Sequence, residues 1–457
     1  MHRVGGFVNT TLDTPGTPCY AVTVLRCAMY AVPFSTGRLE FDLLPGMRGT
    51  LIESHAVPPL EYPAAEVERA LAGPLGSPRL RELARPGDRV CIVYTDPTRA
   101  CPDALLVPPL LAELQAAGVR DADITLLCGT GLHRPSTPAE KIARLGPAIV
   151  NRYRVLDHAA QDENSLVYLG MTESGAPVWV NRWVAGADLV VATGVVEPHL
   201  YAGYSGGRKT VAVGAAGEPT IAFTHGVRMA DEPGTRLGQI EGNPFHATLV
   251  EVAARAGLRF ILNVVLDDDK RVLRVTAGDT ELAFQDLVRF AKSVYEVPIT
   301  QQYDIAIGGV GFPKDANLYQ ASRAPSYLFF APVPVVRKGG FFIIPARCEE
   351  GAGEGVGEQR FLAAMREAPN VQFILDDARK NGYPPGQQRA FVMAKVLEES
   401  NVIIVGSECP GLVRDCKMIP AATMDEALQI ASAQLGPACD VLIVPHAMLT
   451  LPVLQQK

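Results

Sequence analysis

The chain has 457 residues, of which 48% are hydrophobic and 20% are charged, with a formal net charge of -7 at pH 7. This length can bury two cores, because single domains usually stop growing near about 250 residues. Lysine and arginine are scattered rather than gathered into a basic stripe, which argues against nucleic acid and favours a small-molecule partner.

The cysteine pattern and the hydropathy indicate the compartment. The nine cysteines include no C-x-x-C pair, so reduced thiols are a better interpretation than disulfides or a zinc site. No apolar run reaches the roughly 18 residues of a membrane span, so we expect a soluble, cytoplasmic protein that contacts no membrane. Residues 1–28 contain Pro15 and Pro18 and lack a signal-peptide pattern, and we interpret them as a disordered extension or a start placed too early.

From residue 89 onward, short β-branched runs alternate with helical patterns. Strands are predicted at 89–96 and 123–131, and helices at 102–119 and 137–146. The last of these helices has a capping box and a proline at its first position, in the sequence TPAE. The alternation indicates parallel βαβ units.

The remainder of the first half ends in a strand and a hairpin. The apolar run at 187–199 leads into a glycine-rich loop, and catalytic residues often lie at such strand ends. Residues 259–279 form two alternating runs around the acidic turn 267–269, which predicts a hairpin.

The second half repeats the pattern of buried strand, turn and helix, with strands expected near 303–313, 339–347, 401–407 and 439–446. The sequence therefore predicts an α/β protein with two domains, mostly parallel sheets and an active-site cleft between them. We expect an N-terminal catalytic and cofactor domain at 29–295 and a C-terminal α/β domain at 296–425. We expect the terminal segment 426–457 to return to the N-terminal domain.

Three of the eight histidines lie in polar, glycine-flanked loops: His133, His199 and His225. A single such histidine is more often structural than functional. Loops at the carboxyl ends of parallel strands converge on one cleft, however, so three of them within a hundred residues indicate a shared site.

The stretch GYSGGRKT at 203–210 resembles a phosphate-binding loop but has Arg208 where that loop requires glycine, so we reject a nucleoside triphosphatase. Gly206 and Gly207 can still bring backbone N–H groups close to an anion. Lys209 beside them is a candidate nucleophile or charge partner, against the alternative of a solvated surface lysine.

Two further polar groups follow predicted strands. Asp96, Thr98 and Arg99 combine a carboxylate, a hydroxyl and a guanidinium suited to gripping a carboxylate, although Asp96 and Thr98 could also simply cap the next helix. In the second domain, Tyr319, Gln320 and Arg323 begin a helix and could line a polar pocket or face solvent.

Taken together, these motifs resemble the nickel-pincer-nucleotide-dependent lactate racemase family from about residue 30 to the end. The resemblance rests on DPTR at 96–99, GTGLHRP at 129–135, EPHLYAGYSGGRK at 197–209, His225 and NLYQ at 317–320. The spacing from His199 through Lys209 to His225 is also that of the family.

The resemblance implies a function and a role for each residue. The expected reaction is racemisation or epimerisation of a 2-hydroxy acid by reversible hydride transfer through a 2-oxo acid. Lys209 would hold the nickel pincer nucleotide covalently and His225 would bind nickel, while Asp96, Thr98, Gly206 and Gly207 would contact the cofactor. The catalytic bases would be His133 and His199, and the substrate-binding residues Arg99, Tyr319, Gln320 and Arg323.

Arg323 departs from the family, because better-known lactate racemases carry a lysine there and the two cations are not interchangeable. A longer or differently branched 2-hydroxy acid is therefore expected. The resemblance also implies separate enzymes that make the cofactor.

Three other functions fit the sequence less well than the resemblance does. A nicotinamide-dependent 2-hydroxyacid dehydrogenase needs a G-x-G-x-x-G turn, which GTGLHR and GGVGFP both lack at the third glycine. A non-catalytic anion-binding protein would tolerate replacement of His133 or His199 with little change in its affinity for the ligand. A nickel store would have a histidine-rich tract, which this chain lacks.

Overall fold

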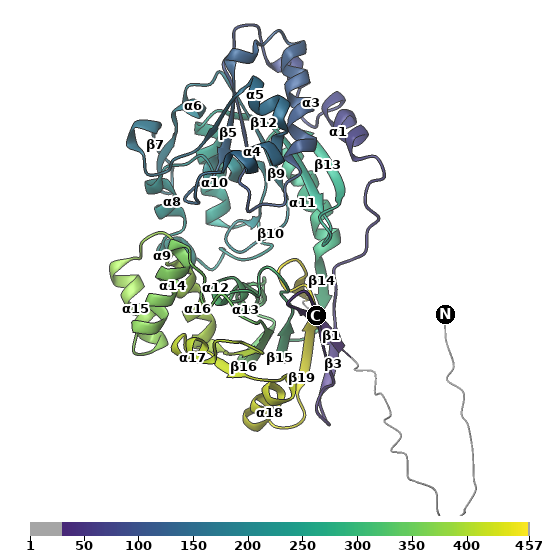
Figure 1. Ribbon diagram of the computed structural model, residues 1–457, viewed down its shortest axis with the longest axis vertical. Helices are drawn as coiled ribbons and strands as arrows, with labels where there is room; N and C mark the ends of the chain where they lie inside the picture. The colour runs from purple at the N-terminus through teal and green to yellow at the C-terminus, as the bar shows by residue number, and fades with distance from the viewer. Residues whose placement is uncertain (1–29, 456–457) are drawn as a thin grey trace, which may run out of the picture.

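The computed structural model describes residues 30–455, and the expected extension at 1–28 lies outside this range. Two α/β lobes are stacked along the long axis, with the first sheet in the upper lobe and the second in the lower (Figure 1). The predicted fold class, two α/β domains with mostly parallel sheets, is confirmed. No helix in the described range is long and apolar enough to cross a membrane.

The upper lobe is built on a six-stranded sheet in the order β13-β12-β9-β4-β5-β6, parallel except for β13. Cys91 and Val93 face one hydrophobic core, while Ile92 and Tyr94 face another, so both faces of this sheet are buried. The strands are β4 (Val90–Thr95), β5 (Ile124–Gly129), β6 (Arg154–Asp157), β9 (Leu189–Val195), β12 (Leu258–Leu266) and β13 (Val272–Gly278).

Helices cover both faces of the upper sheet, and the predicted capping box is confirmed, because Thr137 Oγ1 accepts a hydrogen bond from the Glu140 N–H. The helices between residues 63 and 295 are α1 (Pro63–Ala72), α2 (Leu80–Leu83), α3 (Asp103–Ala116), α4 (Pro138–Leu145), α5 (Pro147–Arg152), α6 (Arg182–Ala185), α7 (Gly207–Ala212), α8 (Glu218–Thr224), α9 (Val227–Asp231), α10 (Pro244–Arg255) and α11 (Leu282–Tyr295). Of these, α9 packs against helices of the lower lobe. Two small hairpins lie beside them, β7 (Leu166–Met171) with β8 (Pro177–Asn181) and β10 (Pro198–His199) with β11 (Gly203–Tyr204).

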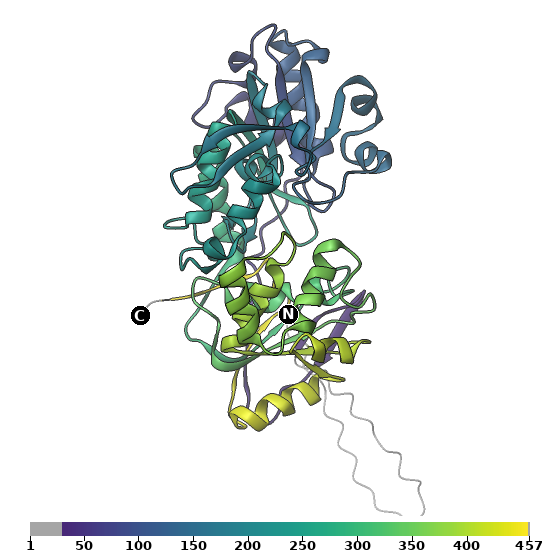
Figure 2. The ribbon, with the colours of Figure 1, turned by 90° about the vertical axis from the view of Figure 1, so that its left-hand side faces the viewer.

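The lower lobe contains a parallel six-stranded sheet in the order β18-β17-β16-β15-β19-β3. Its strands are β3 (Arg48–Leu51), β15 (Tyr303–Gly308), β16 (Val336–Pro345), β17 (Asn401–Val405), β18 (Ile419–Ala421) and β19 (Asp440–Val444). Its helices are α12 (Leu318–Ala321), α13 (Arg323–Phe329), α14 (Val356–Glu367), α15 (Val371–Asn381), α16 (Gln388–Glu399), α17 (Pro410–Asp415) and α18 (Met424–Leu435). Figure 2 shows this lobe below the narrower waist of the molecule.

The expectation that residues 426–457 return to the N-terminal domain is wrong. Strand β19 pairs with β15 and β3 inside the lower sheet. Helix α18 packs on the same sheet, and only residues 436–439 connect it to β19. Four residues span at most about 14 Å, so the strand must join the sheet that α18 already covers. The final strand, β20 (Leu451–Leu454), pairs with β14 (Glu296–Ile299) at the junction of the lobes.

The N-terminal domain also begins later than residue 29. The hairpin of β1 (Tyr30–Phe34) and β2 (Gly37–Phe41) packs Val32 and Phe41 into the core of the lower lobe, and β3 forms an edge of the lower sheet. The chain therefore enters the upper lobe after β3 and returns through β14, so two crossings join the lobes.

Candidate active site

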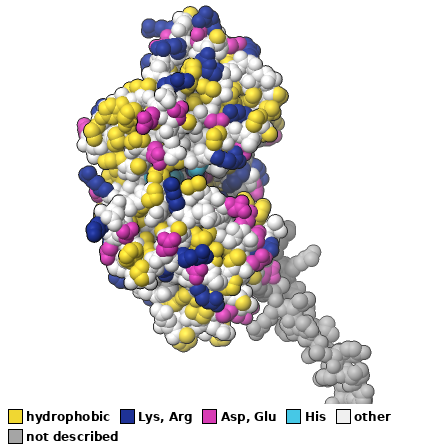
Figure 3. Space-filling view, turned by 60° about the vertical axis from the view of Figure 1, so that its left-hand side comes forward, with side chains coloured by type: hydrophobic (Ala, Val, Ile, Leu, Met, Phe, Trp, Pro, Cys, Tyr) yellow, Lys and Arg dark blue, Asp and Glu magenta, His cyan; other side chains and the backbone are white. Residues whose placement is uncertain are grey.

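A cavity of about 880 Å³ lies between the two lobes. Its upper wall is made by the loops that follow β4, β5 and β9 and by helices α7 and α8, and its lower wall by segments around α12, α14 and α16. The space-filling view shows the waist hollowed, with Lys, Arg and His side chains at the hollow (Figure 3). Of the predicted site residues, only Gly207 is absent from its lining.

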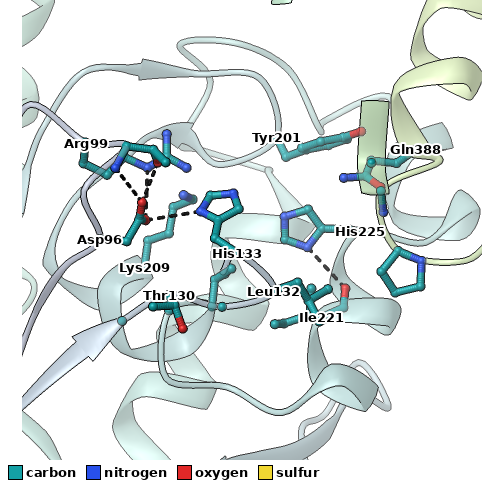
Figure 4. Close-up of a pocket in the computed structure, with 18 of the residues that line it drawn as sticks. Asp96, Arg99, Thr130, Leu132, His133, Tyr201, Lys209, Ile221, His225 and Gln388 are labelled. Atoms are coloured by element: carbon teal, nitrogen blue, oxygen red, sulfur yellow. Dashed lines mark hydrogen bonds and ion pairs between the residues drawn. The ribbon is translucent and has the colours of Figure 1, made fainter. Parts of the chain in front are cut away.

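Asp96 and His133 form a pair on the upper wall (Figure 4). Asp96 Oδ2 lies 3.4 Å from His133 Nδ1 and 3.9 Å from Arg99 Nε, and Asp96 Oδ1 accepts hydrogen bonds from the backbone N–H and the hydroxyl of Thr98. Burial alone would raise the pKa of Asp96, but His133, Arg99 and Thr98 together hold it below its usual range. The ionised carboxylate thus orients His133 with Nδ1 as donor, which leaves Nε2 as the proton acceptor.

A buried ion pair holds the loop that carries Asp96 and Arg99. Arg144 of α4 lies 2.6 Å from the Asp103 carboxylate and donates to the backbone carbonyls of Asp96, Arg99 and Cys101. The same carboxylate accepts hydrogen bonds from Thr95 and Thr193. The buried Asp103 carboxylate is thus paired, as burial requires, and Arg144 ties the loop to α4.

We predict that Arg144→Met lowers the free energy of unfolding by about 3–5 kcal/mol, because it leaves the Asp103 carboxylate, which is fully buried, without its partner. Urea denaturation measures the change. The matched control is Arg134→Met, whose partner Glu140 is in solvent contact and whose loss should change the free energy of unfolding far less. Equal effects of the two substitutions would show that the buried pair does not fix the loop.

Lys209 lies in α7, and its side chain reaches the cavity beside Asp96 and His133 (Figure 4). Burial and the charge of Arg99 lower the pKa of its amine to about 7, although Asp96 opposes the shift. An appreciable fraction of the amine is therefore unprotonated and nucleophilic at neutral pH.

The glycines before Lys209 serve close packing. Gly206 has a φ of 142°, which L-residues rarely adopt, and it lines the cavity. Gly207 instead lies against β12, where a β-carbon would approach Ile261 to 2.5 Å. Gly207 thus lets α7 approach the sheet, and its expected contact with the cofactor stays a prediction.

His225 at the end of α8 presents a free nitrogen. Its Nδ1 lies 3.2 Å from the Ile221 carbonyl oxygen, which can only accept, and 3.0 Å from the Thr224 hydroxyl, which itself donates to backbone carbonyls of α8. Both contacts are satisfied when Nδ1 carries the proton, which leaves a free lone pair on Nε2. In Figure 4 the second ring nitrogen points toward the side where Lys209 and His133 lie. Burial and the charge of Lys209 lower the pKa of His225 to about 4, which keeps the ring neutral.

His199 is in the opposite tautomer. Its Nδ1 accepts hydrogen bonds from the backbone N–H groups of Tyr201 and Ala202, so the neutral ring carries its proton on Nε2. Burial and the charges of Lys209 and Arg99 hold the pKa of His199 well below its usual range. In this arrangement His199 is a hydrogen-bond donor, whereas His133 presents an acceptor.

On the lower wall, Tyr319, Gln320 and Arg323 line the cavity as expected, rather than facing solvent. Arg323 Nη1 donates to Gln320 Oε1 at 3.3 Å. Sequence reasoning missed other lining residues, among them Glu197, Tyr201, Lys314, Tyr383 and Arg389. Glu197 and Tyr201 lie inside a motif already singled out, whereas no motif given above contains the other three.

Comparisons with known proteins place the chain in a family. The lactate racemase N-terminal domain matches residues 34–238 and the lactate racemase C-terminal domain matches residues 299–451. The lactate racemase of Lactiplantibacillus plantarum is 35% identical over 84% of this chain and 89% of its own length. That of Thermoanaerobacterium thermosaccharolyticum is 30% identical over 91% of this chain and 97% of its own.

The solved structures give the same result. The lactate racemase apoprotein from T. thermosaccharolyticum superposes with a TM-score of 0.83 at 29% identity, covering 93% of this chain and 99% of that one. A Thermotoga maritima protein shares the fold, with a TM-score of 0.62 at 19% identity, over 88% of this chain and 100% of its own. The fold and the site thus define a two-lobed α/β isomerase. The chain belongs to the lactate racemase family.

Proposed function

We propose that this chain racemises or epimerises a 2-hydroxy acid by reversible hydride transfer, through a 2-oxo acid, with a nickel pincer nucleotide attached to Lys209. The proposal rests on the family and on the geometry of the cavity. The single observation that carries it is that a nucleophilic amine, Lys209, and an unprotonated imidazole nitrogen, on His225, lie in the same cavity.

The residues present fit such a cofactor. A histidine that binds a metal usually donates its other N–H to a carbonyl or carboxylate, as His225 does to Ile221. No group of three or more metal-binding side chains occurs in the described part of the chain. A metal bound at His225 would therefore need further donors, which the cofactor would supply. Tyr201 also lines the cavity, and its buried hydroxyl has no hydrogen-bond partner in the described structure. This hydroxyl is therefore available to a bound group.

When bound, the cofactor would supply an acceptor that takes hydride from the 2-carbon and returns it to either face. Removing hydride is easier than removing a proton, because the neighbouring carboxylate resists further negative charge. Arg99 on the upper wall would bind that carboxylate, and Tyr319 and Gln320 on the lower wall would add hydrogen bonds, since all three line the cavity. Asp96 orients His133, the proposed base, and Thr98 donates hydrogen bonds to Asp96.

Proton transfer falls to the two histidines. His133 takes the hydroxyl proton at Nε2, and the Asp96 carboxylate stabilises the imidazolium that forms. For the opposite enantiomer we assign the same task to His199. Its Nε2 becomes an acceptor only when Nδ1 carries the proton, so the ring must then give up its contacts with the N–H groups of Tyr201 and Ala202.

The test is to produce the chain together with the enzymes that make the cofactor and to incubate it with one enantiomer of a 2-hydroxy acid. Chiral chromatography should show both enantiomers at equilibrium without added nicotinamide nucleotide. Net oxidation that depends on added nucleotide would indicate a dehydrogenase instead. Binding without conversion, by protein that carries the adduct and nickel, would indicate an anion-binding protein.

We also place this activity in the cytoplasm. The seven cysteines in the described range are all free thiols, and six of them are buried. Unpaired thiols are typical of a reducing compartment.

A further inference from the structure

The two walls of the cavity differ in charge. The carboxylates that line it, Asp96, Glu197 and Glu218, all come from the upper lobe. The lower wall contributes four cations and, within the described residues, no carboxylate; these cations are Lys314, Arg323, Arg360 and Arg389. The site therefore has an excess of positive charge on the side opposite Lys209 and His225.

Arg323 and Arg389 are the two cations of this wall with buried, unused hydrogen-bonding capacity. The Nε atom of each is buried without a partner in the described structure. Their remaining hydrogen bonds go to neutral groups, from Arg323 to Gln320 and Tyr327 and from Arg389 to Ser326, at 3.2 to 3.3 Å. Neither has an ion-pair partner within 4.0 Å among the described residues.

This arrangement is unfavourable at Arg389 without a ligand, whereas the neighbouring Tyr327, Tyr319 and Glu197 raise the pKa of Arg323. Burial and the neighbouring charge of Arg323 lower the pKa of Arg389. Arg389 is also the second residue of α16, where the positive end of the helix dipole opposes a cation. A buried charge without a counter-charge costs free energy, and an anion between the two guanidinium groups would remove that cost.

We propose that Arg323 and Arg389 form a subsite for a second anionic group, so that the preferred substrate is a 2-hydroxydicarboxylate rather than a 2-hydroxymonocarboxylate. This inference rests on the proposed function. Arg99 on the upper wall binds the carboxylate next to the reacting carbon, and the lower wall binds the distal one. The phosphate of the bound nucleotide is the other source of negative charge for the same two groups, and the experiments separate the two sources.

The first experiment uses the unmodified protein and needs no catalysis. Isothermal titration calorimetry compares succinate with butyrate, which have the same carbon count and differ by one carboxylate. Succinate should bind about 30-fold more tightly, as expected for one charge-assisted contact. Arg389→Gln should remove this difference, and Arg389→Lys should restore part of it. The matched control is Arg366→Gln, an exposed arginine on α14 outside the cavity, which should keep it.

The second experiment uses protein loaded with the cofactor. For Arg389→Gln, the ratio of kcat/KM for malate to that for lactate should fall about 100-fold, because truncating one partner of a buried charge pair costs that much. The fraction of protein that carries the adduct, measured by intact mass, should not change. A lower adduct fraction, with both substrates affected equally, would assign the two arginines to the nucleotide phosphate and overturn the substrate proposal.

The two proposals fail in different ways. Equal affinities of the wild-type protein for succinate and butyrate, with faster turnover of lactate than of malate, would overturn the second subsite and leave the racemase function intact. No conversion of either acid by fully loaded protein would overturn the racemase function. A retained preference for succinate would then still support the anion subsite itself.

Discussion

Lys209→Arg is expected to abolish both the cofactor adduct and racemisation. The substitution keeps a positive charge at the position but removes the primary amine, and a guanidinium stays protonated where the Lys209 amine has a pKa of about 7. Intact mass of wild-type protein, co-produced with the cofactor-forming enzymes, should show an addition of nucleotide size on the peptide that contains Lys209. The variant should show none and should have no activity above background.

The control for this prediction is the second amine in the cavity. Burial lowers the pKa of Lys314 to about 8, so this amine, which also lines the cavity, is a competing nucleophile. Lys314→Arg should still form the adduct. An adduct that persists in Lys209→Arg and disappears in Lys314→Arg would show that Lys314, not Lys209, is the attachment site. Wild-type protein that stays unmodified under loading conditions would remove the basis of the proposed function.

The titration of Lys209 can be checked without the cofactor. A small acylating reagent should label Lys209 with a midpoint near pH 7, because the pKa is lowered and the reactive neutral amine accumulates above it. Exposed lysines should react only at higher pH. Peptide mapping at several pH values measures both, and a Lys209 midpoint near that of the exposed lysines would contradict the burial argument.

Nickel content and kcat should distinguish the proposed metal-binding histidine, His225, from the proposed proton-transfer histidine, His133. His225→Ala should lose most of its nickel and all activity, because Nε2 of His225 is the only protein nitrogen assigned to the metal. His133→Ala should keep its nickel and lose about 10²- to 10⁴-fold in kcat, which is the usual contribution of general acid–base catalysis. Metal analysis after desalting and single-substrate kinetics measure the two effects.

A histidine outside the cavity controls for non-specific effects. His55 is exposed and does not line the cavity, so His55→Ala should change neither nickel content nor kcat. If His225→Ala and His133→Ala lost nickel to the same extent, the tautomer argument for His225 would be wrong. If both kept nickel and lost only turnover, the metal ligand would have to be sought elsewhere.

Local sequence determined the elements and most of the site. The apolar runs at 89–96 and 187–199, the capping box at Thr137 and the acidic hairpin turn all appear where they were expected, because each depends on residues close in sequence. The loops with His133 and Lys209 could be brought together from sequence, since the carboxyl ends of parallel strands share one edge of a sheet.

Tertiary structure decided the rest. Sequence predicts that residues 439–446 form a strand, but not which sheet the strand joins; the short connection from α18 decides that. Gly207 looked like part of an anion loop, and only its distance to Ile261 shows a packing role. Arg323 and Arg389 are 66 positions apart, and only the packing of α13 and α16 brings their charges to one wall, because burial and hydrogen-bond partners are properties of the folded chain.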